Sequence, residues 1–436
     1  MFNKDTFCIL PWSSIQINPS GEFKVCCFSG VTDAETLRGD DHGLCLDENG
    51  NQMTIFTHSI LDALNSDYHK QIRLAQSNNE RHPVCKVCWD RDDANARSGQ
   101  ITNSLRFARS FRQLPDLDNA ITLEVAPSKM EPDGSLHNEY PISLDLRFTN
   151  VCNMKCVMCC SRYSNKWYED EFKLYGKTAE PKVEFRTIHN TYRGATLAWH
   201  DSEEWWAQFD LIKHRIRHLY LTGGEPFIVK GHDDLLDRLI ADDLAKNVIL
   251  EYDTNLSVIN DKILKRLSNF KKIVISVSCD DVEDRYELIR FPGNFNTMLE
   301  NLGQLRARNI DIRHLSTCIG IYSIYSPIRL YEYFKPMGYD TYSLRFLRSP
   351  DHSNIALLPD HLKLKVMEVY KASSMPDKWK AFVCGYLENN MGKFSNEQCE
   401  TSVRKHIAYL NRLDELRGTD WKSTFPDVVE LLQEFL

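Results

Sequence analysis

Short apolar segments alternate with helical patterns through the middle of this chain, and this alternation constrains the fold most strongly. The expected strands are Ile142–Phe148, His218–Thr222, Val248–Thr254, Lys272–Cys279, Ile312–Ile319 and Thr341–Leu347. The expected helices between them include Ser202–His214, His232–Lys246, Ile259–Asn269, Asn296–Arg308 and Ser326–Lys335. Such alternation implies a parallel sheet with right-handed crossovers. The sequence therefore predicts an α/β fold, an open, partial (β/α)6 TIM-type barrel from about Pro141 to Leu347.

Three cysteines follow the first expected strand at the spacing C-x3-C-x2-C: Cys152, Cys156 and Cys159. Iron–sulfur clusters favour cysteine ligation, and a [4Fe–4S] cubane bound by three thiolates keeps one iron open to a small molecule. A structural zinc site is the alternative interpretation, since zinc also takes thiolates at short spacings. That site needs a fourth ligand, and Cys160 lies too close behind Cys159 to be a natural one.

A Gly-Gly-Glu-Pro turn, Gly223–Pro226, ends the next expected strand. Glycines let a backbone approach a ligand where any Cβ would clash, although such turns also end ordinary strands. In this order, the cysteine loop and the turn resemble the two signatures of the radical S-adenosylmethionine (SAM) enzymes. Both features fall at the carboxyl ends of strands, where barrel enzymes carry their active groups.

The resemblance implies a [4Fe–4S] cluster whose open iron is chelated by the amino and carboxylate groups of SAM. An electron from the cluster then breaks a carbon–sulfur bond of SAM, and the 5′-deoxyadenosyl radical abstracts hydrogen from a substrate. Gly223, Gly224 and Glu225 match the turn that binds the SAM amino group.

Three further residues at strand ends match positions that contact the SAM ribose and carboxylate in related enzymes: Asn255, Ser276 and Ser278. Asn and Ser also supply ordinary strand-end capping, which is the alternative interpretation of each. The family's Ser-x-Asp-Gly pattern reads Ser278-Cys279-Asp280-Asp281 here, so the local turn lacks its glycine.

The N-terminal region carries a second cysteine pattern, in which Cys8, Gly21 and Cys26 give C-x12-G-x4-C and Cys85 and Cys88 give C-x2-C. Four thiolates are enough to close a cubane or to hold zinc tetrahedrally. The spacing resembles the twitch (half-SPASM) auxiliary-cluster domain of radical SAM enzymes, placed before the barrel as in N-terminal twitch radical SAM proteins. A fully ligated auxiliary [4Fe–4S] cluster would move electrons rather than bind substrate, and zinc remains the alternative.

The second cysteine ligand of the N-terminal pattern is ambiguous, because Cys27 directly follows Cys26. The spacing from Gly21 favours Cys26, and Cys27 remains an alternative. Among the other cysteines, Cys279 lies at the carboxyl end of a strand and Cys160 lies beside the cluster loop. Either thiol is a candidate hydrogen-atom donor to a substrate radical, a step that would make an epimerase rather than a dehydrogenase.

Net charge and cysteine spacing limit the partners and the cellular compartment that we expect. The net charge of −8 gives no overall attraction to nucleic acid or anionic lipid. The N-terminus lacks the apolar run of a signal peptide and no uncharged stretch is long enough to span a bilayer, so we expect a cytoplasmic protein without a membrane partner. Tight C-x2-C groups in such a chain favour metal clusters over disulfides.

The expected domains are a twitch-like auxiliary iron–sulfur domain at 1–138, the radical SAM barrel at 139–355 and a C-terminal helical extension of two or three amphipathic helices at 356–436. An aromatic-rich insert, Ser161–His200, is expected to pack on the barrel and cover the site. The sequence thus predicts an oxidoreductase that abstracts hydrogen from a peptide or small metabolite, leading to dehydrogenation, epimerisation or crosslinking. An electron donor such as flavodoxin or ferredoxin would supply the electron that reduces the cluster. The alternatives are an RNA-modifying radical SAM enzyme and a non-catalytic iron–sulfur or zinc protein.

Overall fold

The computed structural model describes residues 6–30, 43–86, 88–89, 126–137, 139, 141–161, 163–175, 199–348 and 350–436. The described residues fall into two compact units. The first lies within 1–150, 184–252 and 260–273, and the second within 151–183, 253–259 and 274–436. Much of the aromatic-rich insert, residues 176–198, lies outside the described residues.

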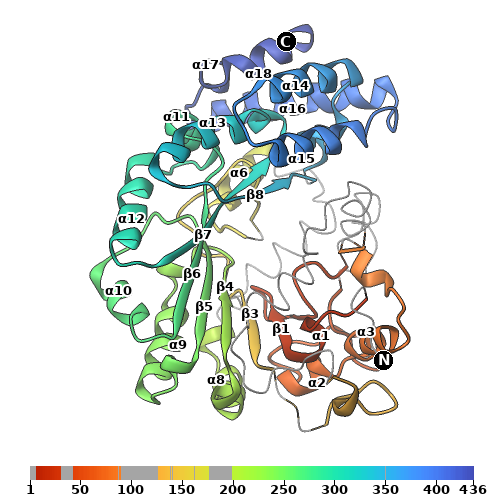
Figure 1. The fold of residues 1–436 in the computed structure, drawn as a ribbon, viewed down its shortest axis with the longest axis vertical. Coiled ribbons are helices and arrows are strands. Elements are labelled where there is room, and N and C mark those ends of the chain that lie inside the picture. The colour runs from red at the N-terminus through yellow and green to blue at the C-terminus, as the bar shows by residue number, and fades with distance from the viewer. Residues whose placement is uncertain are drawn as a thin grey trace. The chain divides into compact units, whose positions relative to one another are not determined.

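The first unit contains a sheet whose strands run in the order β2-β1-β3-β4-β5. The strands are β1 (Ser14–Ile17), β2 (Phe23–Lys24), β3 (Ser143–Leu146), β4 (His218–Leu221) and β5 (Ile249–Thr254). The helices are α1 (Leu10–Ser13), α2 (Ile60–Leu64), α3 (Asp67–Ser77), α8 (Glu203–Ile212), α9 (Lys230–Ala241) and α10 (Asp261–Leu267). From β1 through β5 the pairs are parallel, as the crossover helices require, and Figure 1 shows these strands side by side.

The second unit contains three parallel strands: β6 (Lys272–Ser278), β7 (Asp311–Ile319) and β8 (Tyr342–Phe346). Its helices are α6 (Trp167–Tyr175), α11 (Glu283–Ile289), α12 (Phe295–Ala307), α13 (Ser326–Phe334), α14 (Asp360–Ala372), α15 (Asp377–Glu388), α16 (Asn396–Arg417), α17 (Trp421–Thr424) and α18 (Pro426–Leu431). All six expected strands are present, with ends that differ by one or two residues, so the α/β prediction with parallel strands is confirmed.

The N-terminal segment adds an element that the sequence analysis did not predict. Strand β1 pairs in parallel with β3, and Ser14 lies opposite Ser143. Strand β2 returns antiparallel to β1 after the turn that contains Gly21. The segment that begins with Cys8 therefore shares a sheet with the first strand of the expected barrel.

The C-terminal segment forms five α-helices, α14–α18, rather than two or three, and Figure 1 shows them together at the blue end of the chain. The longest, α16, ends at Gly418, which takes a left-handed conformation with φ 68°. Asp420 then caps α17 by accepting hydrogen bonds from the backbone N–H groups of Lys422 and Ser423, and Pro426 opens α18. These local stop and start signals separate helices that the hydrophobic spacing alone does not distinguish, which is why the sequence predicted fewer of them.

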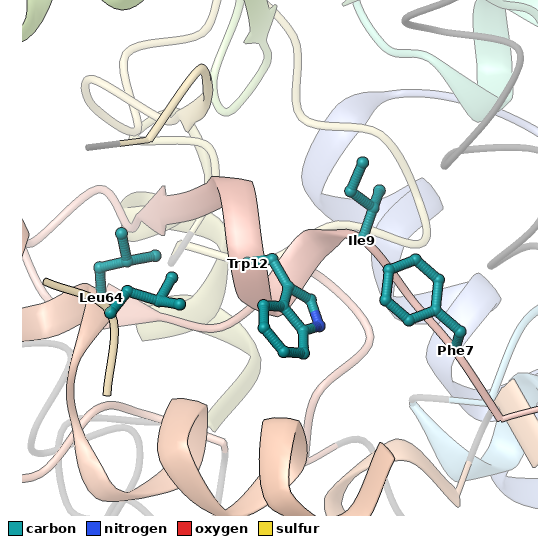
Figure 2. Close-up of a cluster of buried hydrophobic side chains, with 5 residues drawn as sticks. Phe7, Ile9, Trp12 and Leu64 are labelled. Atoms are coloured by element: carbon teal, nitrogen blue, oxygen red, sulfur yellow. The ribbon is translucent and has the colours of Figure 1, made fainter. Parts of the chain in front are cut away.

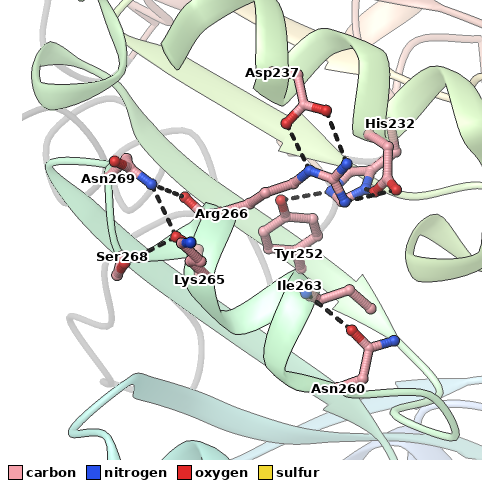
Figure 3. Close-up of polar contacts among 10 residues, drawn as sticks. His232, Asp237, Tyr252, Asn260, Ile263, Lys265, Arg266, Ser268 and Asn269 are labelled. Atoms are coloured by element: carbon pink, nitrogen blue, oxygen red, sulfur yellow. Dashed lines mark hydrogen bonds and ion pairs between the residues drawn. The ribbon is translucent and has the colours of Figure 1, made fainter.

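Polar contacts fix the crossover helices of the first unit, as Figure 3 shows. On α10, the Arg266 guanidinium contacts both carboxylate oxygens of Asp237 on α9, at 2.6 and 2.8 Å, and Asp233 at 2.7 Å. His232 shares a 2.8 Å hydrogen bond with the Tyr252 hydroxyl of β5. Helices α9 and α10 are thus tied to each other and to the strand whose carboxyl end carries Asn255.

Candidate functional site

The cysteine loop at residues 151–160 is held by backbone hydrogen bonds within the second unit. The Lys155 N–H donates to the Phe291 carbonyl at 2.7 Å, and the Val157 N–H donates to the Ile289 carbonyl at 2.8 Å. The side chains of Met154 and Val157 are buried. Met154 and Val157 therefore pack inward, whereas Cys152, Cys156 and Cys159 keep partial exposure.

Side chains from two helices also bind carbonyl oxygens of this loop. The Trp167 indole N–H of α6 donates to the Cys156 carbonyl at 3.0 Å. The Tyr409 hydroxyl of α16 donates to the Val157 carbonyl at 2.8 Å. A helix of the C-terminal extension thus helps to fix the loop, although it follows the loop by some 250 residues in the sequence.

A buried carboxylate links the loop to the same two helices. Asp170 on α6 accepts from the Lys155 ammonium at 2.7 Å and from the Arg417 guanidinium at 3.0 Å. The Asp170 and Arg417 side chains are only 3% and 2% exposed. The Arg417 guanidinium also lies over the Trp167 ring at 4.7 Å. We call Lys155, Asp170 and Arg417 the loop clamp.

The three thiols form a donor set that fits a cationic iron–sulfur cluster. Loss of hydration raises the pKa of Cys156, which the nearby Arg290 charge partly offsets. Loss of hydration also raises the pKa of Cys159 well above its usual value, and the neighbouring thiols Cys160, Cys156 and Cys152 raise it further. Thiolates that repel one another in this way are stabilised when a metal cluster supplies the positive charge among them.

Asn255, which follows β5, makes its hydrogen bonds to the cysteine loop. Its amide N–H donates to the Asn153 side-chain oxygen at 3.0 Å and lies 4.0 Å from the Cys152 sulfur. The Asn153 amide in turn donates to the Ser257 hydroxyl at 2.7 Å. Asn255 therefore orients the loop beside a cluster cysteine, and a contact with SAM remains a prediction.

The other residues expected at strand ends lie at different depths. Ser276 is buried within β6, while Ser278 is half-buried at its end. The Cys279 thiol is fully buried and donates to the Asp281 carbonyl at 3.2 Å. Cys160 keeps partial exposure. Of the two candidate hydrogen donors, Cys160 is thus the more accessible, and both assignments remain predictions.

The Gly-Gly-Glu-Pro turn lies in the first unit, directly after β4. Gly223 and Gly224 both take positive φ angles, 80° and 58°. A Cβ on Gly223 would approach the Arg147 Cβ to 2.7 Å, which no side chain tolerates. The Glu225 side chain is buried and accepts a hydrogen bond from the Phe227 N–H at 3.3 Å. The two glycines are half-buried, and an L side chain at Gly223 could therefore not adopt this backbone without a clash.

Replacing Gly223 with alanine tests whether this backbone contacts SAM. A left-handed alanine costs about 1–2 kcal/mol before the clash with Arg147, and we expect SAM affinity to fall about tenfold or more. Gly50→Ala is the matched control, because its φ of 79° is the same but nothing lies within 4 Å of the added Cβ. Isothermal titration should show weaker SAM binding in the first variant only, with iron content unchanged. Equal SAM affinity in both variants would contradict a SAM contact at this turn.

The N-terminal cysteines of the first unit come together at one pocket. Its lining includes Cys8, Cys26, Cys85 and Cys88 with Leu10, Pro11, Val25, Phe28, Ser29, Gln76 and Trp89. Cys27, which follows β2 in a turn rather than on a strand, is not part of this lining. The structure thus gathers the four cysteines of the predicted auxiliary site, which are separated by up to 80 positions in the sequence.

Apolar neighbours fix these cysteines. Phe7 and Ile9, on either side of Cys8, pack with Trp12, Leu64 and Leu136, and Figure 2 shows Trp12 between Leu64 and this segment. The Trp12 indole N–H donates to the Gln76 side chain of α3 at 2.7 Å.

Val25 and Val84, which precede Cys26 and Cys85, pack together with Ile72 of α3. Cys8, Cys26 and Cys85 therefore each lie directly beside at least one buried residue of these clusters. Among the described residues, no three or more His, Cys, Asp or Glu side chains are arranged closely enough to hold a single metal ion.

Comparisons with known proteins identify two domains in the chain. The family model of the radical SAM superfamily matches residues 146–325. The chain contains a radical SAM domain. A second model, described as an iron–sulfur cluster-binding (SPASM) domain, matches residues 8–89 and so spans the four N-terminal cysteines. The two domains imply a [4Fe–4S] cluster that works with SAM and an auxiliary iron–sulfur cluster.

A curated relative is the sporulation killing factor maturation protein SkfB of Bacillus subtilis (strain 168). It is 25% identical over 181 residues, which are 41% of this chain and 36% of SkfB. The match therefore spans about a third of the length of that relative.

Two solved structures illustrate the range of similar chains. One, described as native anSMEcpe with bound AdoMet and Kp18Cys peptide, has 14% identity, a TM-score of 0.34, and coverage of 56% of this chain and 62% of that chain. The other, Streptococcus suis SuiB bound to precursor peptide SuiA, has 14% identity, a TM-score of 0.35, and coverage of 67% of this chain and 60% of that chain.

None of the helices in the described part of the chain has the length and apolar character needed to cross a membrane.

Sequence reasoning missed several residues that contact the cysteine loop or, like Arg417, a side chain that binds it. Asp170, Arg290, Tyr409 and Arg417 were not singled out, because nothing in the sequence joins residues so far apart. Only Asp280 carried a signal: an acidic residue directly after an apolar strand that the structure buries completely.

Proposed function

We propose that this chain cleaves SAM reductively and uses the resulting radical to abstract hydrogen from a polypeptide precursor. The observation that carries the proposal is the C-x3-C-x2-C loop, whose backbone is held by hydrogen bonds from α6, α16 and residues 289–291. A loop fixed so firmly presents its three cysteines in one arrangement, as a cluster with an open iron requires.

In this proposal, different residues hold the cluster, orient the cysteine loop and bind SAM. Cys152, Cys156 and Cys159 hold the cluster, and Asn255 orients the loop that carries Cys152. When bound, the cluster and SAM supply the electron and the radical that removes hydrogen from the substrate. The backbone at Gly223 and Gly224, with the Glu225 carboxylate, binds the SAM amino group, and Ser276 and Ser278 bind its ribose and carboxylate.

The N-terminal pocket has a different task. Cys8, Cys26, Cys85 and Cys88 hold an auxiliary [4Fe–4S] cluster with all its irons ligated, and we assign it to electron transfer. An electron acceptor of this kind suits dehydrogenation, epimerisation or crosslinking.

The substrate class rests on the relative SkfB. Its name describes the maturation of a killing factor. Maturation converts a precursor into its final form, and we therefore favour a polypeptide over a small metabolite. The net charge of −8 argues against RNA, because RNA binding depends on basic contacts to phosphates.

Transfer of deuterium tests this proposal directly. Reconstituted, dithionite-reduced protein is given unlabelled SAM and one of three perdeuterated fractions from the organism of origin: peptides, small metabolites or RNA. Mass spectrometry is expected to find deuterium in 5′-deoxyadenosine with the peptide fraction only. Deuterium from metabolites or RNA instead would reassign the substrate class. The absence of any 5′-deoxyadenosine from iron-loaded protein with all three fractions would overturn the enzymatic proposal.

A further inference from the structure

A buried ion pair stands at the carboxyl end of β6, in the second unit. Asp280 is fully buried, and its Oδ2 lies 2.7 Å from Nη2 of Arg290, whose side chain is 10% exposed. The other carboxylate oxygen accepts a hydrogen bond from the Cys318 N–H at the end of β7, at 2.7 Å. Asp280 is therefore held on both sides, and it fixes the Arg290 guanidinium in turn.

The second terminal nitrogen of this guanidinium faces the cysteine loop. Arg290 Nη1 lies 3.9 Å from the Cys156 sulfur, at the long end for a hydrogen bond to sulfur. An arginine is always charged, and at this depth its charge is weakly screened by solvent. A full positive charge thus lies beside the Cys156 thiol. The carboxylate partner of this charge, Asp280, contacts the other terminal nitrogen of the guanidinium.

We propose that Arg290, positioned by Asp280, raises the reduction potential of the cluster bound through Cys156. This inference rests on the proposed function in one respect, namely that Cys156 is a cluster ligand. Reduction adds one electron to the cluster from an external donor without adding a proton, so the cluster and its thiolates become more negative by one charge. A nearby cation stabilises the reduced form more than the oxidised form, and a nearby anion does the opposite. Hydrogen bonds to ligand sulfurs and local charge are known levers on such potentials.

The two members of the pair therefore predict shifts of opposite sign. Arg290→Gln is expected to make the potential more negative, with the ratio of reduced to oxidised cluster at the wild-type midpoint at least tenfold lower, which equals 59 mV for one electron. Asp280→Asn keeps the acceptor for the Cys318 N–H but removes the opposing charge, so the potential should become less negative. A purely structural role would not produce opposite signs.

The chain offers a matched control in the neighbouring ion pair. Arg329 Nε contacts Asp281 Oδ1 at 3.1 Å, next to Asp280 in the sequence. No contact between Arg329 and a cluster cysteine is found among the described residues, and Arg329→Gln should leave the potential unchanged. If Arg290→Gln does not fold, Asp280→Asn carries the test through its less negative potential. Arg290→Lys, which keeps the charge, should then hold the potential close to that of the wild type.

The measurement is a redox titration followed by electron paramagnetic resonance, without SAM, in a Cys85→Ala/Cys88→Ala background that removes the auxiliary cluster. Iron is counted in every sample first. Unchanged potentials in loaded Arg290→Gln and Asp280→Asn would overturn the inference and leave the proposed function intact. Loss of SAM affinity in Arg290→Gln with an unchanged potential would likewise overturn it and make Arg290 a SAM contact. A background protein whose iron does not depend on Cys152, Cys156 and Cys159 would instead show that the proposed function fails.

Discussion

Replacing Cys152, Cys156 and Cys159 together with alanine is expected to abolish 5′-deoxyadenosine formation from SAM. The same variant should lose about four of about eight irons per chain, since each [4Fe–4S] cluster contributes four. The physical reason is that SAM binds the open iron of the cluster that these thiols hold, so that losing the cluster removes both the electron source and the binding site. Iron analysis and an anaerobic assay with dithionite measure the two effects.

Cys160→Ala is the control for this experiment, because Cys160 is adjacent to Cys159 and shares its partial exposure. Its thiol is not needed for a three-cysteine cluster, so iron content and SAM cleavage should stay at wild-type levels. Loss of iron in Cys160→Ala equal to the loss in the triple variant would mean that the loop binds its metal through four thiols. That result would support the zinc interpretation and oppose an open iron.

The auxiliary site is tested in the same assay. Cys85→Ala/Cys88→Ala should remove about four irons while SAM cleavage continues, because the catalytic loop is untouched. Cys27→Ala should keep all the iron, since Cys27 is not part of the pocket lining. Zinc at a stoichiometry of one, removed by the double variant, would contradict the auxiliary iron–sulfur cluster.

Much of the fold could be predicted because the deciding signals are local. Apolar runs such as His218–Leu221 followed by a helical pattern specify β4 and its crossover without reference to the rest of the chain. The pairing of β1 with β3 could not be found in this way, because four-residue strands separated by more than 120 positions carry no mark of their partner. Register between distant strands is decided by packing, which sequence periodicity does not report.

In the candidate site, too, local signals could be predicted from the sequence and long-range contacts could not. The cysteines were found because thiols at short spacings identify their own chemistry, and the structure gathers Cys8 and Cys26 with Cys85 and Cys88 at one pocket. The residues that hold the cysteine loop were not found. Tyr409 is an ordinary helical tyrosine in the sequence, and only the packing of α16 brings its hydroxyl to the Val157 carbonyl.

The loop clamp is expected to be the most sensitive of these long-range supports. Asp170→Asn keeps the size of the side chain but leaves the Lys155 and Arg417 charges without their common partner. Breaking a buried ion pair by removing one member typically costs about 3–5 kcal/mol of unfolding free energy, and Arg417, only 2% exposed, cannot recover its hydration. Denaturation of the metal-free protein by urea measures the loss.

A local measurement connects this loss to the loop. The Lys155 and Val157 amides donate to the Phe291 and Ile289 carbonyls, and their hydrogen exchange should accelerate in Asp170→Asn because the loop opens more often. Iron retention under a chelator should fall in parallel. Both effects follow from one cause, namely that α6 and α16 no longer share a charge partner with the loop.

Asp210→Asn is the matched control, because Asp210 also joins one lysine and one arginine, Lys213 at 2.9 Å and Arg238 at 2.8 Å. Asp210 is 43% exposed, so its partners regain water when the carboxylate is lost. Surface pairs contribute about 0–1 kcal/mol, and this variant should therefore unfold almost as the wild type does. Equal stability of the two variants would mean that the clamp is hydrated in solution and that the C-terminal helices do not hold the cysteine loop through it.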